Sequence, residues 1–151
     1  MKNITAIILT SIILIVPVLA QQSEQDNSVI EPKVRFAPLH IYLDSGNEPL
    51  AAFQFELKAT AGQIKIVGVE GGQHPAFKEA PYYDPAALAN DRIIIAAFNT
   101  GRDLPKGRTR IATIHLQIIG DAVPDYELNL TVAADTDGKE IPAKISFEKG
   151  E

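Results

Sequence analysis

The sequence predicts an all-β protein built as an antiparallel β-sandwich. Short runs in which apolar and polar residues alternate begin near Val34 and continue to the end of the chain, and this period-two pattern indicates strands with one buried face. The runs recur about every 10 to 15 residues and are separated by Gly, Pro, Asn and Asp. Closely spaced strands with such turns favour two packed antiparallel sheets.

The first twenty residues stand apart from this pattern and predict a secretory signal. Lys2 precedes an apolar run over residues 4–16, and a small-residue cleavage site ends at Ala20. We therefore expect cleavage after Ala20 and a secreted or periplasmic protein. The alternative is an uncleaved signal segment that anchors the chain in the membrane, but the run is short for a span, which needs about 20 residues.

The rest of the chain divides into a polar leader and one domain. Residues 21–33 lack periodicity and predict a flexible leader, whereas residues 34–151 predict the sandwich domain. Of 14 basic and 19 acidic residues, only Lys2 lies in the signal, so the remainder carries a net charge of −6. This balance argues against nucleic acid as a partner. The absence of cysteine excludes thiol catalysis and thiolate metal sites.

The first predicted strand covers residues 39–43 and is followed by the turn "DSGNEP". Residues 53–72 then resemble a hairpin, but we interpret them as two strands of a larger sandwich. After Ile64 and Ile66, the apolar parity changes at Val67 and Val69, which flank Gly68. A β-bulge at Val67-Gly68 would keep both valines in the core, and the alternative is a strand buried on both faces.

The second half of the chain predicts four more strands and one helical turn. Residues 93–98 are apolar on both faces, as expected of a strand covered on both sides. Asp84 and Pro85 predict a capped helical turn at residues 84–90. The other strands are expected where apolar residues alternate, at residues 111–118, 126–132 and 141–147.

No motif in the sequence predicts catalysis, and we expect no enzyme activity, no metal and no cofactor. The three histidines, His40, His74 and His115, are far apart, and no zinc-protease motif occurs. The segment "DTDGKE" (135–140) has only two carboxylates before its glycine, so a β-turn is favoured over a calcium loop.

One aromatic cluster offers a route to carbohydrate binding. Phe77, Tyr82 and Tyr83 lie close together in a chain without Trp, and planar aromatics form the usual sugar-binding surfaces. The same three rings could instead be a hydrophobic plug for their own loop, and we favour the plug.

Three segments together resemble the cohesin family. These segments are "LHIYLDSGNEPLAAFQFELKATAGQIKIVGVEGG" (39–72), "NDRIIIAAFNTGRDLPKGRTRIATIHLQIIG" (90–120) and "AADTDGKEIPAKI" (133–145). The family's domains contain a strand of the type apolar-x-Phe-x-apolar, a loop that ends in glycine before an "A-T-I" strand, and a closing Asp-x-x-Gly turn. The resemblance implies a jelly-roll sandwich of about nine strands that binds dockerins, calcium-loaded modules attached to polysaccharide-degrading enzymes.

The resemblance also implies which residues would contact a partner. One sheet face would carry them, with hydrogen-bonding residues around a modest apolar centre. The expected contact residues are Ala52, Gln54, Glu56, Ile95, Ala97, Asn99, Thr100, Arg102, Thr113 and His115.

Three functions therefore follow from the sequence. The leading hypothesis is an exported, non-catalytic module that binds a protein partner, and the second is direct binding of a polysaccharide. The third is a structural subunit of the cell envelope, in which the leader pairs with the sheet edge of a neighbour.

Overall fold

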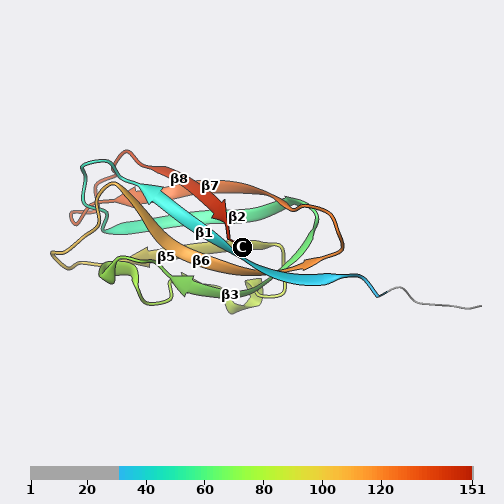
Figure 1. Ribbon diagram of the computed structural model, residues 1–151. Helices are drawn as coiled ribbons and strands as arrows, with labels where there is room; N and C mark the ends of the chain where they lie inside the picture. Colours follow the sequence, from blue (N-terminus) through green and yellow to red (C-terminus); the bar gives the residue numbers. More distant parts are fainter. Residues whose placement is uncertain (1–30, 151) are drawn as a thin grey trace, which may run out of the picture. The chain divides into compact units, whose positions relative to one another are not determined.

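A computed structural model describes residues 31–150 of the chain (Figure 1). The expected signal and residues 21–30 of the expected leader lie outside the described residues. The described chain forms two antiparallel sheets of four strands each, which confirms the predicted all-β sandwich, with eight strands rather than nine. The β1 sheet has the order β3-β6-β1-β8, and the β2 sheet has the order β4-β5-β2-β7.

The eight strands and two short 3-10 helices follow one another closely. The first half contains β1 (Val34–Asp44), β2 (Ala52–Ala61), β3 (Gln63–Gly71), η1 (Pro75–Phe77), β4 (Tyr82–Tyr83) and η2 (Pro85–Ala87). The second half contains β5 (Arg92–Phe98), β6 (Arg108–Ile119), β7 (Asp125–Ala134) and β8 (Lys144–Lys149). The predicted helical turn is confirmed as η2, where Asp84 Oδ1 accepts a hydrogen bond from the Ala86 N–H (2.9 Å).

The strand pairs are nested in the jelly-roll manner. Strand β4 pairs with β5, β3 with β6, β2 with β7 and β1 with β8, all antiparallel. Such nesting arises when one long hairpin of four successive strand pairs is rolled into two sheets. The chain changes sheet at almost every connection, and only β4 and β5 are both consecutive and paired. Residues 53–72 are therefore not a hairpin, because β2 and β3 belong to different sheets.

The inner faces of the two sheets form the hydrophobic core. Leu39, Ile41 and Leu43 on β1 are buried, as the alternation predicted. On β2, Phe53 and Phe55 are buried with stacked rings, and the ring of Phe77 meets that of Phe53 edge to face at 5.1 Å. Buried apolar area of this kind is the main stabilising contribution in a chain without disulfides.

The predicted β-bulge in β3 is confirmed, but it does not bury both valines. The register with β6 shifts between Ile66 and Gly68, so Val67 is the extra residue. Val67 is 44% exposed, whereas Val69 faces the core after the shift. The expectation for Val67 was wrong because a bulge that restores the inward phase for Val69 must leave one residue outside the ladder.

Two adjacent glycines at the end of β3 allow a close approach of three chain segments. A Cβ on Gly71 would overlap the Lys78 carbonyl oxygen, and a Cβ on Gly72 would overlap that of Arg110. The Gly72 N–H donates to the Phe77 carbonyl oxygen at 2.7 Å. The glycines therefore hold the loop that carries Phe77 against the end of the sandwich.

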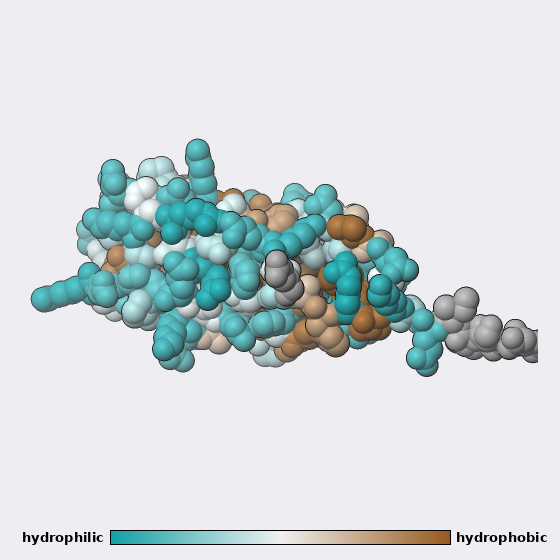
Figure 2. Space-filling view, viewed as in Figure 1, coloured by the Kyte–Doolittle hydropathy of each residue, from teal (hydrophilic) through white to brown (hydrophobic). Residues whose placement is uncertain are grey.

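Apolar side chains are not spread evenly over the surface. Figure 2 shows polar side chains over most of the visible face and apolar atoms gathered at the end where β1 begins. The exposed apolar residues at that end are Val34, Phe36 and Val123. A second group of exposed apolar residues lies on the outer face of the β2 sheet.

Candidate binding face

The outer face of the β2 sheet carries part of the surface implied by the cohesin resemblance. Because Phe53, Phe55 and Leu57 point into the core, the intervening residues of β2 point outward. Ala52 and Gln54 are half-buried there and lie opposite Phe98 and Ala96 of β5. Glu56 is the third outward residue of β2.

Two β5 residues that we expected on the contact surface, Ile95 and Ala97, point towards the core instead. Ile95 is fully buried at 0% exposure, and Ala97 packs against the core. Neither residue lies on the expected contact surface, because the register places Ile95 opposite the buried Phe55. The expectation that β5 is covered on both faces was also wrong, since Ile94 is 46% exposed.

Four exposed apolar side chains gather on this outer face, and we call them the β2-sheet patch. They are Tyr82 (69% exposed), Phe98 (66%), Ile94 (46%) and Val132 (41%). The rings of Tyr82 and Phe98 are stacked, with centroids 6.1 Å apart and an angle of 12° between their planes. Tyr82 and Phe98 thus form one contiguous exposed apolar surface, which is typical of interaction sites rather than of scattered surface residues.

Val132 joins the patch because of an irregularity in β7. The sequence predicted that Val132 shares the inward face of Tyr126, Leu128 and Leu130. The register with β2 shifts between Gln54 and Phe55, and Val132 turns outward while Ala133 is buried. At the shift, Thr131 donates its hydroxyl to the Gln54 carbonyl oxygen (3.0 Å) and accepts from Gln54 Nε2 (3.2 Å).

A charged pair borders the patch on the side of Ile94. The Arg92 guanidinium donates to Glu56, which lies opposite Ile94 in the register. The hydrogen bond from Arg92 lowers the pKa of Glu56, and the same bond raises the pKa of Arg92. Glu56 is therefore ionised and engaged by its own sheet, which limits its role to the border of a contact surface.

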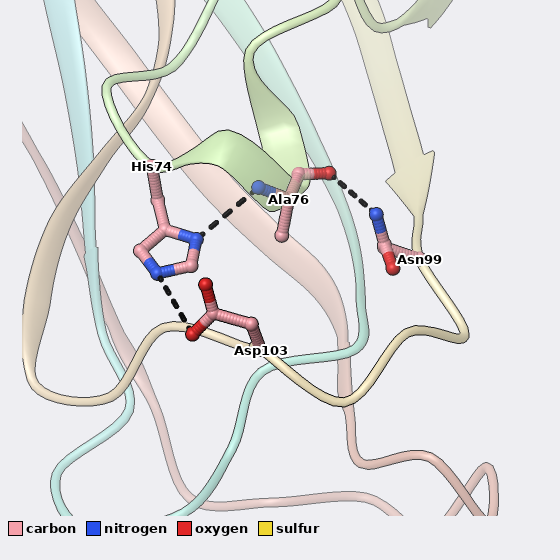
Figure 3. Close-up of polar contacts among 4 residues, drawn as sticks. All are labelled: His74, Ala76, Asn99 and Asp103. Atoms are coloured by element: carbon pink, nitrogen blue, oxygen red, sulfur yellow. Dashed lines mark hydrogen bonds and ion pairs between the residues drawn. The ribbon is translucent and has the colours of Figure 1, made fainter.

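The loop after β5 is held in place by Asn99 and His74 (Figure 3). Asn99 Nδ2 donates to the Ala76 carbonyl oxygen (2.9 Å), and Asn99 Oδ1 accepts from the Gly101 N–H (2.7 Å). His74 Nδ1 accepts from the Ala76 N–H (3.2 Å), and His74 Nε2 lies 3.9 Å from an Asp103 carboxylate oxygen. Asn99 thus positions this loop through both ends of its side-chain amide.

The neighbours of Asn99 in this loop remain available for contacts. Thr100 and Arg102 are both exposed and follow directly from Phe98 at the end of β5. They place a hydroxyl and a guanidinium on the surface of the loop that follows β5.

Thr113 and His115 do not belong to this face. Both lie on β6 in the β1 sheet, which is the opposite layer of the sandwich. Thr113 is buried and lies 3.1 Å from His40 Nδ1, and His115 Nε2 is 3.1 Å from a Glu70 carboxylate oxygen. The sequence could not reveal this separation, because sheet membership depends on topology rather than on alternation.

The aromatic cluster at residues 77–83 does not form one platform. Phe77 is only 4% exposed and Tyr83 packs against the core, so both act as the plug that we favoured. Tyr82 alone is well exposed, and its neighbouring ring is Phe98. Sequence reasoning missed Phe98 because it lies well beyond the cluster along the chain and is brought to Tyr82 only by the pairing of β4 with β5.

No metal cluster accompanies this face. Within residues 31–150, no group of three or more His, Cys, Asp or Glu side chains could hold a metal ion. In the segment "DTDGKE", Asp135 Oδ1 accepts from the N–H groups of Asp137 and Lys139, both at 2.9 Å. That carboxylate oxygen closes a turn, as the β-turn interpretation of this segment predicted.

Comparisons with known proteins returned no significant similarity. No family model, no curated protein and no solved structure matches the chain. Over the described residues, no helix is both long and apolar enough to cross a membrane. The fold therefore defines the chain as an antiparallel jelly-roll sandwich.

Proposed function

We propose that this chain is an exported, non-catalytic binding module that recognises a protein partner through the outer face of the β2 sheet. The cohesin resemblance implies a dockerin-type module as that partner and a role in polysaccharide degradation. The contact surface consists of the β2-sheet patch, the polar residues Gln54, Thr100 and Arg102, and the small residues Ala52 and Ala96.

The observation that supports this proposal most strongly is the exposure of Tyr82 and Phe98 side by side on one sheet face. Aromatic residues are enriched among the residues that dominate binding energy in protein interfaces. A standard interface buries about 800 Å² on each partner, which the outward residues of neighbouring strands can supply. Gln54 lies near the middle of this surface, and its side chain is already oriented by Thr131.

The proposal is tested by measuring the binding of calcium-loaded dockerin modules with isothermal titration calorimetry. We expect Tyr82→Ser with Phe98→Ser to weaken binding at least tenfold, which corresponds to about 1.4 kcal/mol. The control is Phe36→Ser with Val67→Ser, which replaces two exposed apolar side chains on the β1 sheet. Binding that is absent in the wild-type chain, or equally weakened in both variants, would refute the proposal.

The stacked pair of Tyr82 and Phe98 also supports a second candidate function, the direct binding of polysaccharide. Two nearly parallel exposed rings offer a planar apolar surface of the kind that sugar rings contact. Affinity electrophoresis in gels that contain soluble polysaccharides tests this candidate. Retardation that is lost in Tyr82→Ala but kept in Tyr83→Phe would support it, and mobility unaffected by any polysaccharide would exclude those glycans as ligands.

A further inference from the structure

The outermost strand pair of the jelly roll, β1 with β8, is incomplete. The C-terminal end of β8 does not reach the N-terminal end of β1. Strand β1 pairs with β6 along its full length from Val34, but its pairing with β8 starts only at Leu39. In Figure 1, the C-terminal end of β8 (red) stops well short of the N-terminal end of β1 (cyan). Residues 34–38 therefore have a described strand neighbour on one side only.

On the open side of β1, the backbone groups before Pro38 have no strand partner among residues 31–150. The Gly150 N–H donates to the Pro38 carbonyl oxygen at 2.9 Å, so the Pro38 carbonyl points to the side of β8. Residues two apart in a strand direct their peptide groups to the same side. The N–H and C=O groups of Phe36 and Val34 therefore point to the side of β1 beyond the end of β8, where they are a template for an added strand.

A cavity of about 100 Å³ lies directly beside this open edge. Its apolar wall is formed by Ala37 and Leu39 of β1, Leu116 and Ile118 of β6, and Tyr126 of β7. Arg35, Lys149 and the Val123-Pro124 turn line its rim. A strand that continued the line of β8 would direct every second side chain into this cavity. The β1 slot, as we call residues 34–38 with this cavity, thus lacks one strand with an inward apolar residue.

The surroundings of the β1 slot define the chemistry of a suitable strand. Val34 and Phe36 are exposed on the outer face of the same edge, at 46% and 68%. Lys33 lies 3.6 Å from Asp121, and Lys149 Nζ donates to the Pro124 carbonyl oxygen. Arg35 forms no ion pair with another described residue. The slot therefore favours a strand with two adjacent apolar residues, one for each face, and with acidic residues near Arg35.

We propose that the β1 slot binds residues 21–31 of a second copy of this chain as an added β-strand. This segment contains Glu24, Asp26 and Glu31 and no basic residue, and its only apolar residues are the adjacent pair Val29 and Ile30. Adjacent residues of a strand point to opposite faces. One of the pair enters the cavity, and the other covers Val34 and Phe36.

The length of the segment suits this exchange between copies. Five residues of an extended strand, the length of the slot, span about 16 Å, and the eleven residues 21–31 span about 36 Å. The segment joins its own domain at the same end of the sandwich that carries the slot. Two copies can therefore exchange their segments reciprocally in an isologous dimer, or in succession along an open chain.

Sedimentation velocity over a range of concentrations tests this proposal. We expect residues 21–151 to self-associate and residues 32–151, which retain every strand, to stay monomeric. Val29→Ser with Ile30→Ser should weaken self-association at least tenfold, because an apolar side chain leaves the cavity. Gln22→Ser with Gln25→Ser is the matched control and should have no effect. Arg35→Glu should weaken association, whereas Lys144→Glu at the far end of β8 should not.

A fluorescent peptide of residues 21–31 provides a second measurement that does not depend on the oligomer. We expect this peptide to bind residues 32–151, with a loss of affinity at higher salt. Monomeric behaviour of residues 21–151 at all concentrations would overturn the proposal, and so would association that persists without the segment. If the peptide binds residues 32–151 while residues 21–151 stay monomeric, the proposal is also overturned. The segment would then occupy the β1 slot of its own chain. Tyr82→Ser with Phe98→Ser should leave self-association unchanged, which separates this proposal from the function assigned to the β2 sheet.

Discussion

Substitution of Phe77 tests whether its ring belongs to the hydrophobic core rather than to a binding surface shared with Tyr82. The ring is 4% exposed and meets Phe53 edge to face at 5.1 Å. Truncation of a buried Phe to Ala costs about 3–5 kcal/mol, and an aromatic pair contributes about 0.5–1.5 kcal/mol of that. For a domain of this size, about 4 °C in Tm corresponds to 1 kcal/mol, so Phe77→Ala should lower Tm by about 12–20 °C.

Thermal unfolding followed by far-ultraviolet circular dichroism measures this effect. Tyr82→Ala is the control, because it removes an aromatic ring of similar size that is 69% exposed and should shift stability by less than about 0.5 kcal/mol. A Tm for Phe77→Ala within about 3 °C of the wild-type value would refute the assignment of Phe77 to the core. The ring would then be free to act with Tyr82 as a ligand platform.

Three further predictions concern the bulge, the paired glycines and the charged border. Deletion of Val67 should change the free energy of unfolding by less than about 1 kcal/mol. Deletion of Lys65 should lower it by at least about 1.5–3 kcal/mol, the burial energy of one isoleucine. Urea denaturation measures both changes. Gly72→Ala should destabilise by about 2–3 kcal/mol in the same assay, because the new methyl group meets a backbone carbonyl. The depressed pKa of Glu56 means that its pair with Arg92 stabilises the fold above the ordinary glutamate pKa and loses this effect as pH falls through the folded pKa. An NMR titration of the Glu56 carboxyl should show that pKa return towards its ordinary value in Arg92→Ala.

The strands with strict alternation could be predicted closely from the sequence. Over residues 39–43 of β1 and along β2, every second residue is apolar and most of the others are polar, so only one face can be buried, and Leu39 and Phe55 are buried as expected. The bulge in β3 could also be located, because an isolated change of apolar parity at a glycine is typical of a bulged strand. The exposure of Val67 could not be predicted from the sequence, because either valine could have been the extra residue of the bulge.

The contribution of β5 to the proposed binding face was harder to predict, because this strand is apolar on both sides. Ile93, Ile94 and Ile95 are chemically alike, so the sequence of β5 does not indicate which of them points inward. Pairing with β2 decides the question, because Ile95 lies opposite Phe55 and Ile94 lies opposite Glu56. The error for Thr113 and His115 has the same origin, since local pattern does not specify the sheet to which a strand belongs.

The nesting of the strand pairs has a consequence for how the chain acquires its structure. Only β4 and β5 can pair soon after they are synthesised, and each further pair encloses the one before it, until β8 reaches β1. Domains dominated by such distant pairings fold in milliseconds to seconds rather than microseconds. The final pair requires the last strand of the domain, so a nascent chain still lacks its complete fold when most of it has emerged. For a chain exported as proposed, the core would therefore stay open while the chain is still being synthesised.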